Sequence, residues 1–116
     1  MNNFMRMIVF FDLPVKTKTQ RRVATQFRNF LLKDGYFMVQ FSVYCRLCNG
    51  YDDVEKHKAR IRNYKPDNGS VRLLVITEKQ YEKMELIIRN LVKEEEHASF
   101  EQLSIFYMKN NRKLIR

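Results

Sequence analysis

The stretch Met5-Arg6-Met7-Ile8-Val9-Phe10-Phe11-Asp12-Leu13-Pro14 decides how this chain begins to fold. Most of its apolar residues are consecutive rather than alternating, a pattern typical of a strand that is buried on both faces. We therefore predict a strand over residues 5–12 in the centre of a sheet. Leu13-Pro14 then turns the backbone, so Asp12 is expected at the end of this strand. It is the one carboxylate in the first 33 residues.

A basic amphipathic helix is predicted next. Thr17 and Gln20 have the spacing of a capping box, in which both side chains bind free backbone amides at a helix start. Apolar residues recur on one side of this helix, at Val23, Phe27, Phe30 and Leu31. Gly35 is the expected stop.

The middle of the chain is predicted to form two strands. Apolar and polar residues alternate over residues 36–47, which is the period of a strand. Because this segment is long for one strand, we expect two short strands, or one with a sharp bend, near Gln40 to Ser42. Asn49-Gly50 marks the following turn.

A second helix and a further strand follow that turn. Asp52 and Glu55 are expected to cap a helix that runs to about Tyr64. The β-branched run over residues 71–76 predicts a strand, and a second capping-box spacing at Thr77 predicts a turn of helix.

The C-terminal part is predicted to lie outside the main domain. Residues 84–88 fit both helical and strand periods, and we favour a strand. An acidic linker over residues 94–96 leads to a last predicted strand at 100–108 and a basic tail. We therefore divide the chain into a core domain, residues 1–90, and a C-terminal segment, residues 91–116.

The order of these elements predicts an α+β fold. Strand, helix, strand, strand, helix, strand is the order of a ferredoxin-like βαββαβ sandwich with both helices on one face, here with an additional C-terminal strand. The other face of the sheet would expose apolar side chains. We therefore expect a homodimer packed through sheet faces.

Charge favours a polyanionic partner. The 116 residues include 22 Lys and Arg against 13 Asp and Glu, a formal net charge of +9. Apolar runs of about five residues are far short of the ~20 that span a membrane, and no export signal is evident, so a cytoplasmic location is expected.

The two cysteines, Cys45 and Cys48, have a C-x-x-C spacing. A redox pair usually lies at a helix start, whereas these lie at the end of a predicted strand. A closed zinc site would need two more ligands, and only His57 and His97 are available. We interpret both as ordinary reduced cysteines.

Two roles are open for Asp12. It could form an Asx turn that leads into the helix. Alternatively, Asp12 could be a catalytic residue and a ligand of Mg²⁺ or Mn²⁺. In a two-fold dimer, the two copies of Asp12 could share one ion with water and phosphate oxygens.

Basic residues surround this position in the sequence. Six of them, and no acid, lie between Lys16 and Lys33. A single-sign basic helix face favours nucleic acid over plain solvation. The candidate contacts are Lys16, Lys18, Arg21, Arg22 and Arg72.

Three motifs together carry a resemblance to a known family: Ile8-Val9-Phe10-Phe11-Asp12-Leu13-Pro14, Gln40-Phe41-Ser42-Val43-Tyr44 and Leu74-Val75-Ile76-Thr77-Glu78-Lys79-Gln80. Over roughly residues 5–90 the chain resembles the small second protein of CRISPR adaptation, the partner of the CRISPR integrase. The resemblance implies a ferredoxin-like homodimer in which Asp12 of both subunits flanks a divalent-metal site. It also implies binding of duplex DNA and bridging of two integrase dimers while new spacers are acquired.

Other functions stay open beside that one. The same fold could act mainly as a metal-dependent endoribonuclease or deoxyribonuclease, because members of the family are credited with cleaving RNA or DNA. An RNA-recognition module has the same topology and would bind single-stranded RNA, but the sequence lacks the Gly-containing strand motif of that class.

Overall fold

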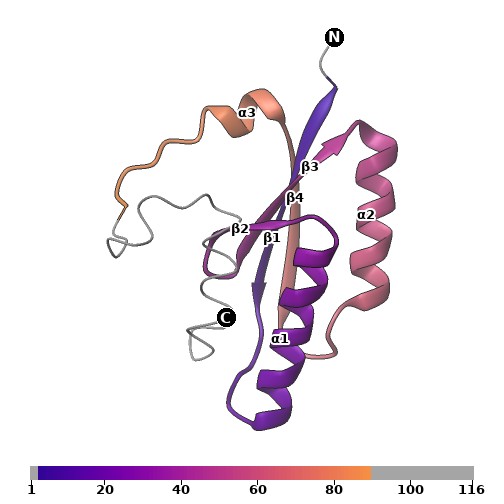
Figure 1. Cartoon of the computed structure of the whole chain (residues 1–116), viewed down its shortest axis with the longest axis vertical. Coiled ribbons are helices and arrows are strands. Elements are labelled where there is room, and N and C mark those ends of the chain that lie inside the picture. The colour runs from indigo at the N-terminus through magenta and orange to yellow at the C-terminus, as the bar shows by residue number, and fades with distance from the viewer. Residues whose placement is uncertain (1–2, 90–116) are drawn as a thin grey trace.

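The computed structural model describes residues 3–89 and contains one antiparallel sheet with three helices (Figure 1). The elements in chain order are β1 (Phe4–Asp12), α1 (Lys18–Lys33), β2 (Phe37–Gln40), β3 (Val43–Asn49), α2 (Tyr51–Tyr64), β4 (Ser70–Thr77) and α3 (Glu78–Glu82). The strand order is β2-β3-β1-β4. This is the predicted α+β, ferredoxin-like arrangement, and β1 is central as expected.

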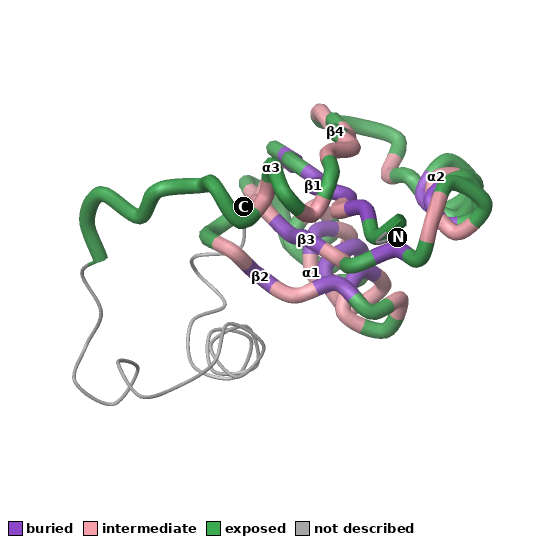
Figure 2. Tube along the Cα trace, turned by 90° about the horizontal axis from the view of Figure 1, so that it is seen from above, coloured by how far each residue is buried: buried purple, intermediate pink, exposed green. Residues whose placement is uncertain are grey.

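The core lies between the sheet and the two long helices. Side chains alternate along β1, and Met5, Met7, Val9 and Phe11 join the core with Phe27 of α1. Figure 2 shows burial concentrated in β1, β3 and parts of α1, whereas much of α2 is exposed. The other residues of β1 therefore lie on the face of the sheet opposite α1 and α2, which we call the open face.

Helix α1 begins as the sequence predicted. Thr17 is its N-cap, and the Thr17 and Gln20 side chains form the complete capping box. Helix α2 begins earlier than expected, at Tyr51, with Gly50 as N-cap and no side-chain cap. The expected caps Asp52 and Glu55 are therefore wrong, because both lie inside the helix.

The bend predicted near Gln40 to Ser42 is confirmed. It separates β2 from β3, and Ser42 has a positive φ of 66°. The Ser42 carbonyl turns toward β1 and accepts a hydrogen bond from the Phe11 amide at 3.0 Å. The bend thus supports the last residues of β1.

The strand favoured over residues 84–88 is wrong. This segment follows α3 and forms no helix or strand, and all its side chains are exposed. A strand needs a neighbour to pair its backbone groups, and residues 84–88 pair with none of the described strands. The linker at 94–96 and the strand predicted at 100–108 lie outside the described residues.

Helix α3 is held on the open face by Arg6. The Arg6 guanidinium donates to both carboxylate oxygens of Glu78, at 2.7 and 3.1 Å. It also stacks over the Tyr81 ring, 4.4 Å from its centre. None of the helices within residues 3–89 is long and apolar enough to span a bilayer.

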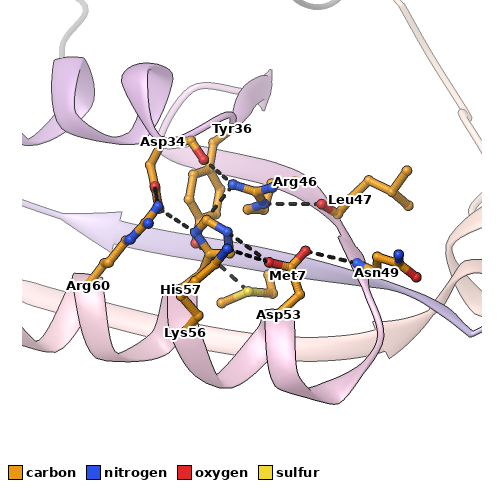
Figure 3. Close-up of polar contacts among 10 residues, drawn as sticks. All are labelled: Met7, Asp34, Tyr36, Arg46, Leu47, Asn49, Asp53, Lys56, His57 and Arg60. Atoms are coloured by element: carbon orange, nitrogen blue, oxygen red, sulfur yellow. Dashed lines mark hydrogen bonds and ion pairs between the residues drawn. The ribbon is translucent and has the colours of Figure 1, made fainter.

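A buried charged cluster joins α1, β3 and α2 (Figure 3). The His57 side chain is only 3% exposed, and its Nδ1 lies 2.7 Å from the Asp34 carboxylate. Its Nε2 lies 3.2 Å from Asp53. Asp34 also accepts from Arg60 at 2.5 Å, and its backbone carbonyl accepts from Arg46. His57 is therefore a structural residue, occupied on both ring nitrogens.

We predict that Asp34→Ala lowers the free energy of unfolding by about 3 kcal/mol or more, because it leaves the buried His57 ring without its carboxylate partner. Glu55→Ala is the matched control on α2, the helix that carries His57, because Glu55 is largely exposed and, within residues 3–89, pairs only with Lys58. Its expected cost is at most about 1 kcal/mol. Urea unfolding measures both. An equal decrease in the free energy of unfolding for Asp34→Ala and Glu55→Ala would contradict a stabilising role of the buried cluster.

Candidate nucleic-acid interface around Asp12

Asp12 is the last residue of β1 and lies beside Ser70, the first residue of β4. Its side chain is exposed and shares the open face with Phe10. Leu13, which follows, is buried in the core. The chain is therefore anchored immediately after Asp12.

The Asp12 carboxylate has no partner among the residues that the structure describes. It forms no hydrogen bond or ion pair with any of residues 3–89. It therefore takes no part in an Asx turn, and its oxygens are available to a ligand. The free carboxylate favours the second role that the sequence left open.

The loop from β1 to α1 is fixed by its own hydrogen bonds. The Gln20 side chain accepts from the Lys16 and Thr17 amides at 2.9 and 3.0 Å. The Arg21 guanidinium donates to the carbonyls of Val15 and Lys16, at 3.2 and 3.1 Å. The sequence predicted Arg21 only as a nucleic-acid contact. Its hydrogen bonds to the loop depend on the conformation of that loop, which the helical pattern of the sequence does not predict.

The predicted basic residues lie at the same end of the molecule as Asp12 (Figure 1). Lys16, Lys18, Arg21 and Arg22 are exposed on the loop and the first turns of α1. Figure 1 shows this loop at the same end of the molecule as the start of β4. Arg72 of β4 is in register with Phe10 of β1, so its side chain lies on the open face. Asp12 is two residues along β1 from Phe10 and lies on the same face.

Two further cations reach this end and were missed by the sequence reading. Arg62 and Lys65, at the end of α2, are exposed where the chain turns back toward β4. The sequence could have indicated them, because the predicted helix ends near Tyr64 and the predicted strand begins at residue 71. The residues between them must therefore lie at the end of the sheet where that strand begins. We use the name Asp12 end for Asp12 together with the exposed cations described above: Lys16, Lys18, Arg21, Arg22, Arg62, Lys65 and Arg72.

The described residues of one chain offer only one ligand for a candidate metal site at this end, the Asp12 carboxylate. Within residues 3–89, no three side chains of His, Cys, Asp or Glu lie close enough together to hold a metal ion. Mg²⁺ commonly binds through one or two carboxylates and completes its shell with water and phosphate oxygens. An exposed carboxylate with exposed cations at the same end of the molecule fits that ion, and it does not fit a closed zinc site.

The cysteines are not part of any site in the described structure. Cys45 and Cys48 are both free and buried. They lie three residues apart on β3, so their side chains point to opposite faces, and only Cys48 belongs to the core beneath the helices. The interpretation as reduced, structural cysteines agrees with this geometry.

We predict that both thiols resist alkylation in the folded protein. Burial raises the pKa of the Cys45 thiol from 9.0 to about 11, and it also raises the pKa of Cys48. Because the thiolate is the reactive form, that change at Cys45 lowers its thiolate fraction about 100-fold at pH 8. Iodoacetamide labelling followed by mass spectrometry should find little modification until the protein is unfolded. Rapid labelling of the native protein would contradict the burial.

Comparison with known proteins gives consistent matches. The family model described as CRISPR associated protein Cas2 matches residues 5–84. The CRISPR-associated endoribonuclease Cas2 of Acidovorax ebreus (strain TPSY) is 49% identical over 102 residues, which cover 88% of this chain and 100% of that protein. The protein of the same name from Campylobacter jejuni subsp. jejuni is 42% identical over 105 residues, covering 90% and 73% of the two chains. That of Flavobacterium psychrophilum is 42% identical over 99 residues, covering 85% of each.

Proposed function

This chain belongs to the Cas2 family of CRISPR-associated proteins, and from that premise we propose that it binds duplex DNA and bridges integrase dimers while new spacers are acquired. The observation that carries the proposal is the Asp12 end, where exposed cations surround a rigid loop. Lys16, Lys18 and Arg22 form no ion pair within residues 3–89. Cations without a carboxylate partner are free to neutralise phosphates.

A dimer through the open face is part of the proposal. This face exposes Phe10, Leu47 and Leu74, each at least a third accessible. Apolar side chains gathered on one sheet face favour a protein interface, and a second copy of the chain is the simplest partner. Because Asp12 shares this face, a two-fold axis near its end would bring the two copies of Asp12 toward each other.

A second function is metal-dependent cleavage of RNA or DNA. It is favoured by the exposed Asp12 carboxylate, which has no partner within residues 3–89, and by the relatives, which are named endoribonucleases. Asp12 would hold Mg²⁺ or Mn²⁺, which when bound supplies positive charge to a scissile phosphate. Arg72 and Lys16 would orient the strand by binding neighbouring phosphates. Single-stranded RNA and duplex DNA are both candidate substrates.

The bridging role is tested by the mass of a complex. The purified chain is mixed with a partner integrase and a short duplex, and the assembly is measured by analytical ultracentrifugation. We expect one species that contains two copies of this chain and two integrase dimers. An integrase–duplex complex that leaves this chain behind as a separate species would contradict bridging.

A further inference from the structure

Gly69 lies directly against the backbone that carries Asp12. A Cβ at position 69 would lie 2.6 Å from the Asp12 carbonyl oxygen and 2.9 Å from Leu13 Cδ2. It would also lie 3.1 Å from Leu13 Cα. Real Cβ atoms essentially never approach backbone this closely, so a side chain at position 69 forces a shift where the turn before β4 meets the Asp12–Leu13 peptide.

The peptide that Gly69 touches is fixed on its other sides. Leu13 is buried in the core, and the preceding amide, that of Phe11, donates to Ser42 at 3.0 Å. Asp12 itself is in register with Ser70, the residue after Gly69. The backbone at Asp12 therefore cannot shift away from position 69 without breaking one of these contacts.

We infer that Gly69 is a positioning residue, which sets the direction of the Asp12 carboxylate by allowing the turn between α2 and β4 to close on the end of β1. The direction of a short side chain such as Asp follows from its own backbone. A displaced Asp12–Leu13 peptide therefore moves the carboxylate with it. The inference rests on the proposed role of Asp12 as a metal ligand.

The chain offers a control that separates contact from backbone strain. Gly69 and Gly50 both have positive φ, 98° and 86°, where any other residue is strained. Nothing lies within 4 Å of a Cβ at position 50. Gly69→Ala and Gly50→Ala thus both place an alanine at positive φ, and only the first brings a Cβ against the Asp12 backbone.

The experiment compares wild type, Gly69→Ala, Gly50→Ala and Asp12→Asn. Two-dimensional NMR records the Asp12 and Leu13 amides, and electron paramagnetic resonance of Mn²⁺ measures metal affinity in the presence of a short duplex. We expect Gly69→Ala to shift both amide resonances and to weaken Mn²⁺ binding about tenfold or more. Gly50→Ala should match wild type in both.

The outcomes distinguish this inference from the proposed function. If Asp12→Asn weakens Mn²⁺ binding but Gly69→Ala behaves like Gly50→Ala, Gly69 does not position Asp12. If Asp12→Asn binds Mn²⁺ as wild type does, the metal role of Asp12 fails, while the amide shifts still report whether Gly69 controls its backbone.

A measurement on wild type covers the case in which Gly69→Ala does not fold. The backbone order parameters of Asp12 and Leu13 should be near 0.85, as in rigid secondary structure, because Asp12 is in register with Ser70 and Leu13 is buried in the core. Values below about 0.6 would show a mobile carboxylate and would overturn the inference.

Discussion

Asp12→Asn is expected to reduce metal-dependent cleavage of RNA or DNA by about 100-fold or more. Asn keeps the shape of the side chain but loses the charge that holds a hard cation, and stabilisation by such an ion amounts to several kcal/mol. Each 1.36 kcal/mol corresponds to about tenfold in rate. Nucleic-acid binding should be kept or strengthened, because a negative charge beside the phosphates is removed. Gel assays with purified protein and Mg²⁺ measure both.

The matched control for this change is Asp52→Asn. Asp52 is also exposed, and it lies in the first turn of α2, away from the Asp12 end. The Asp52→Asn variant should cleave RNA or DNA as the wild-type protein does. Cleavage that survives in Asp12→Asn would mean that Asp12 is not the metal ligand or that the activity comes from another protein in the preparation.

The second large effect is expected from removing the two lysines that follow Asp12 most closely in the sequence. Lys16→Ala with Lys18→Ala should weaken duplex binding about equally for all sequences. It should also lower the slope of log affinity against log salt by about two units, because each lysine–phosphate contact contributes close to one. The helix start should survive, because only the Lys16 backbone takes part in the capping bonds. Fluorescence anisotropy across a salt series gives the slope.

Lys56→Ala with Lys58→Ala is the matched control, since it removes the same charge. These lysines pair with Asp53 and Glu55, at 3.4 and 3.2 Å, on the exposed side of α2. Removing Lys56 and Lys58 should change the slope of log affinity against log salt by less than removing Lys16 and Lys18 does. Equal changes for the two double variants would indicate that binding depends on net charge and not on the Asp12 end.

Much of the fold could be predicted because its signals are local. The apolar run before Asp12, the capping box at Thr17 and the bend at Ser42 each depend on neighbouring residues, and each is confirmed. The strand favoured at 84–88 failed because a strand depends on a partner that its own sequence does not contain. A local sequence pattern predicts a helix or strand most reliably when the hydrogen bonds of its backbone N–H and C=O groups are made to neighbouring residues.

The candidate site was predicted less completely for the same reason. Asp12 and the cations beside it in sequence could be singled out, because a carboxylate at a strand end followed by a basic helix is a local pattern. The contact of Gly69 with Asp12, and the pairing of His57 with Asp34, join residues far apart in the chain. Such contacts follow from the packing of the whole fold, so spacing alone does not reveal them.

The most direct test of the central claim is spacer integration in a reconstituted reaction. The reaction contains a partner integrase, a short duplex and a CRISPR array, with wild-type protein, with Asp12→Asn, or with neither. We predict that integration requires this chain and that Asp12→Asn supports it as well as wild type does, because bridging needs the dimer and its cations and not the carboxylate. Integration that proceeds equally well without the chain would contradict the account.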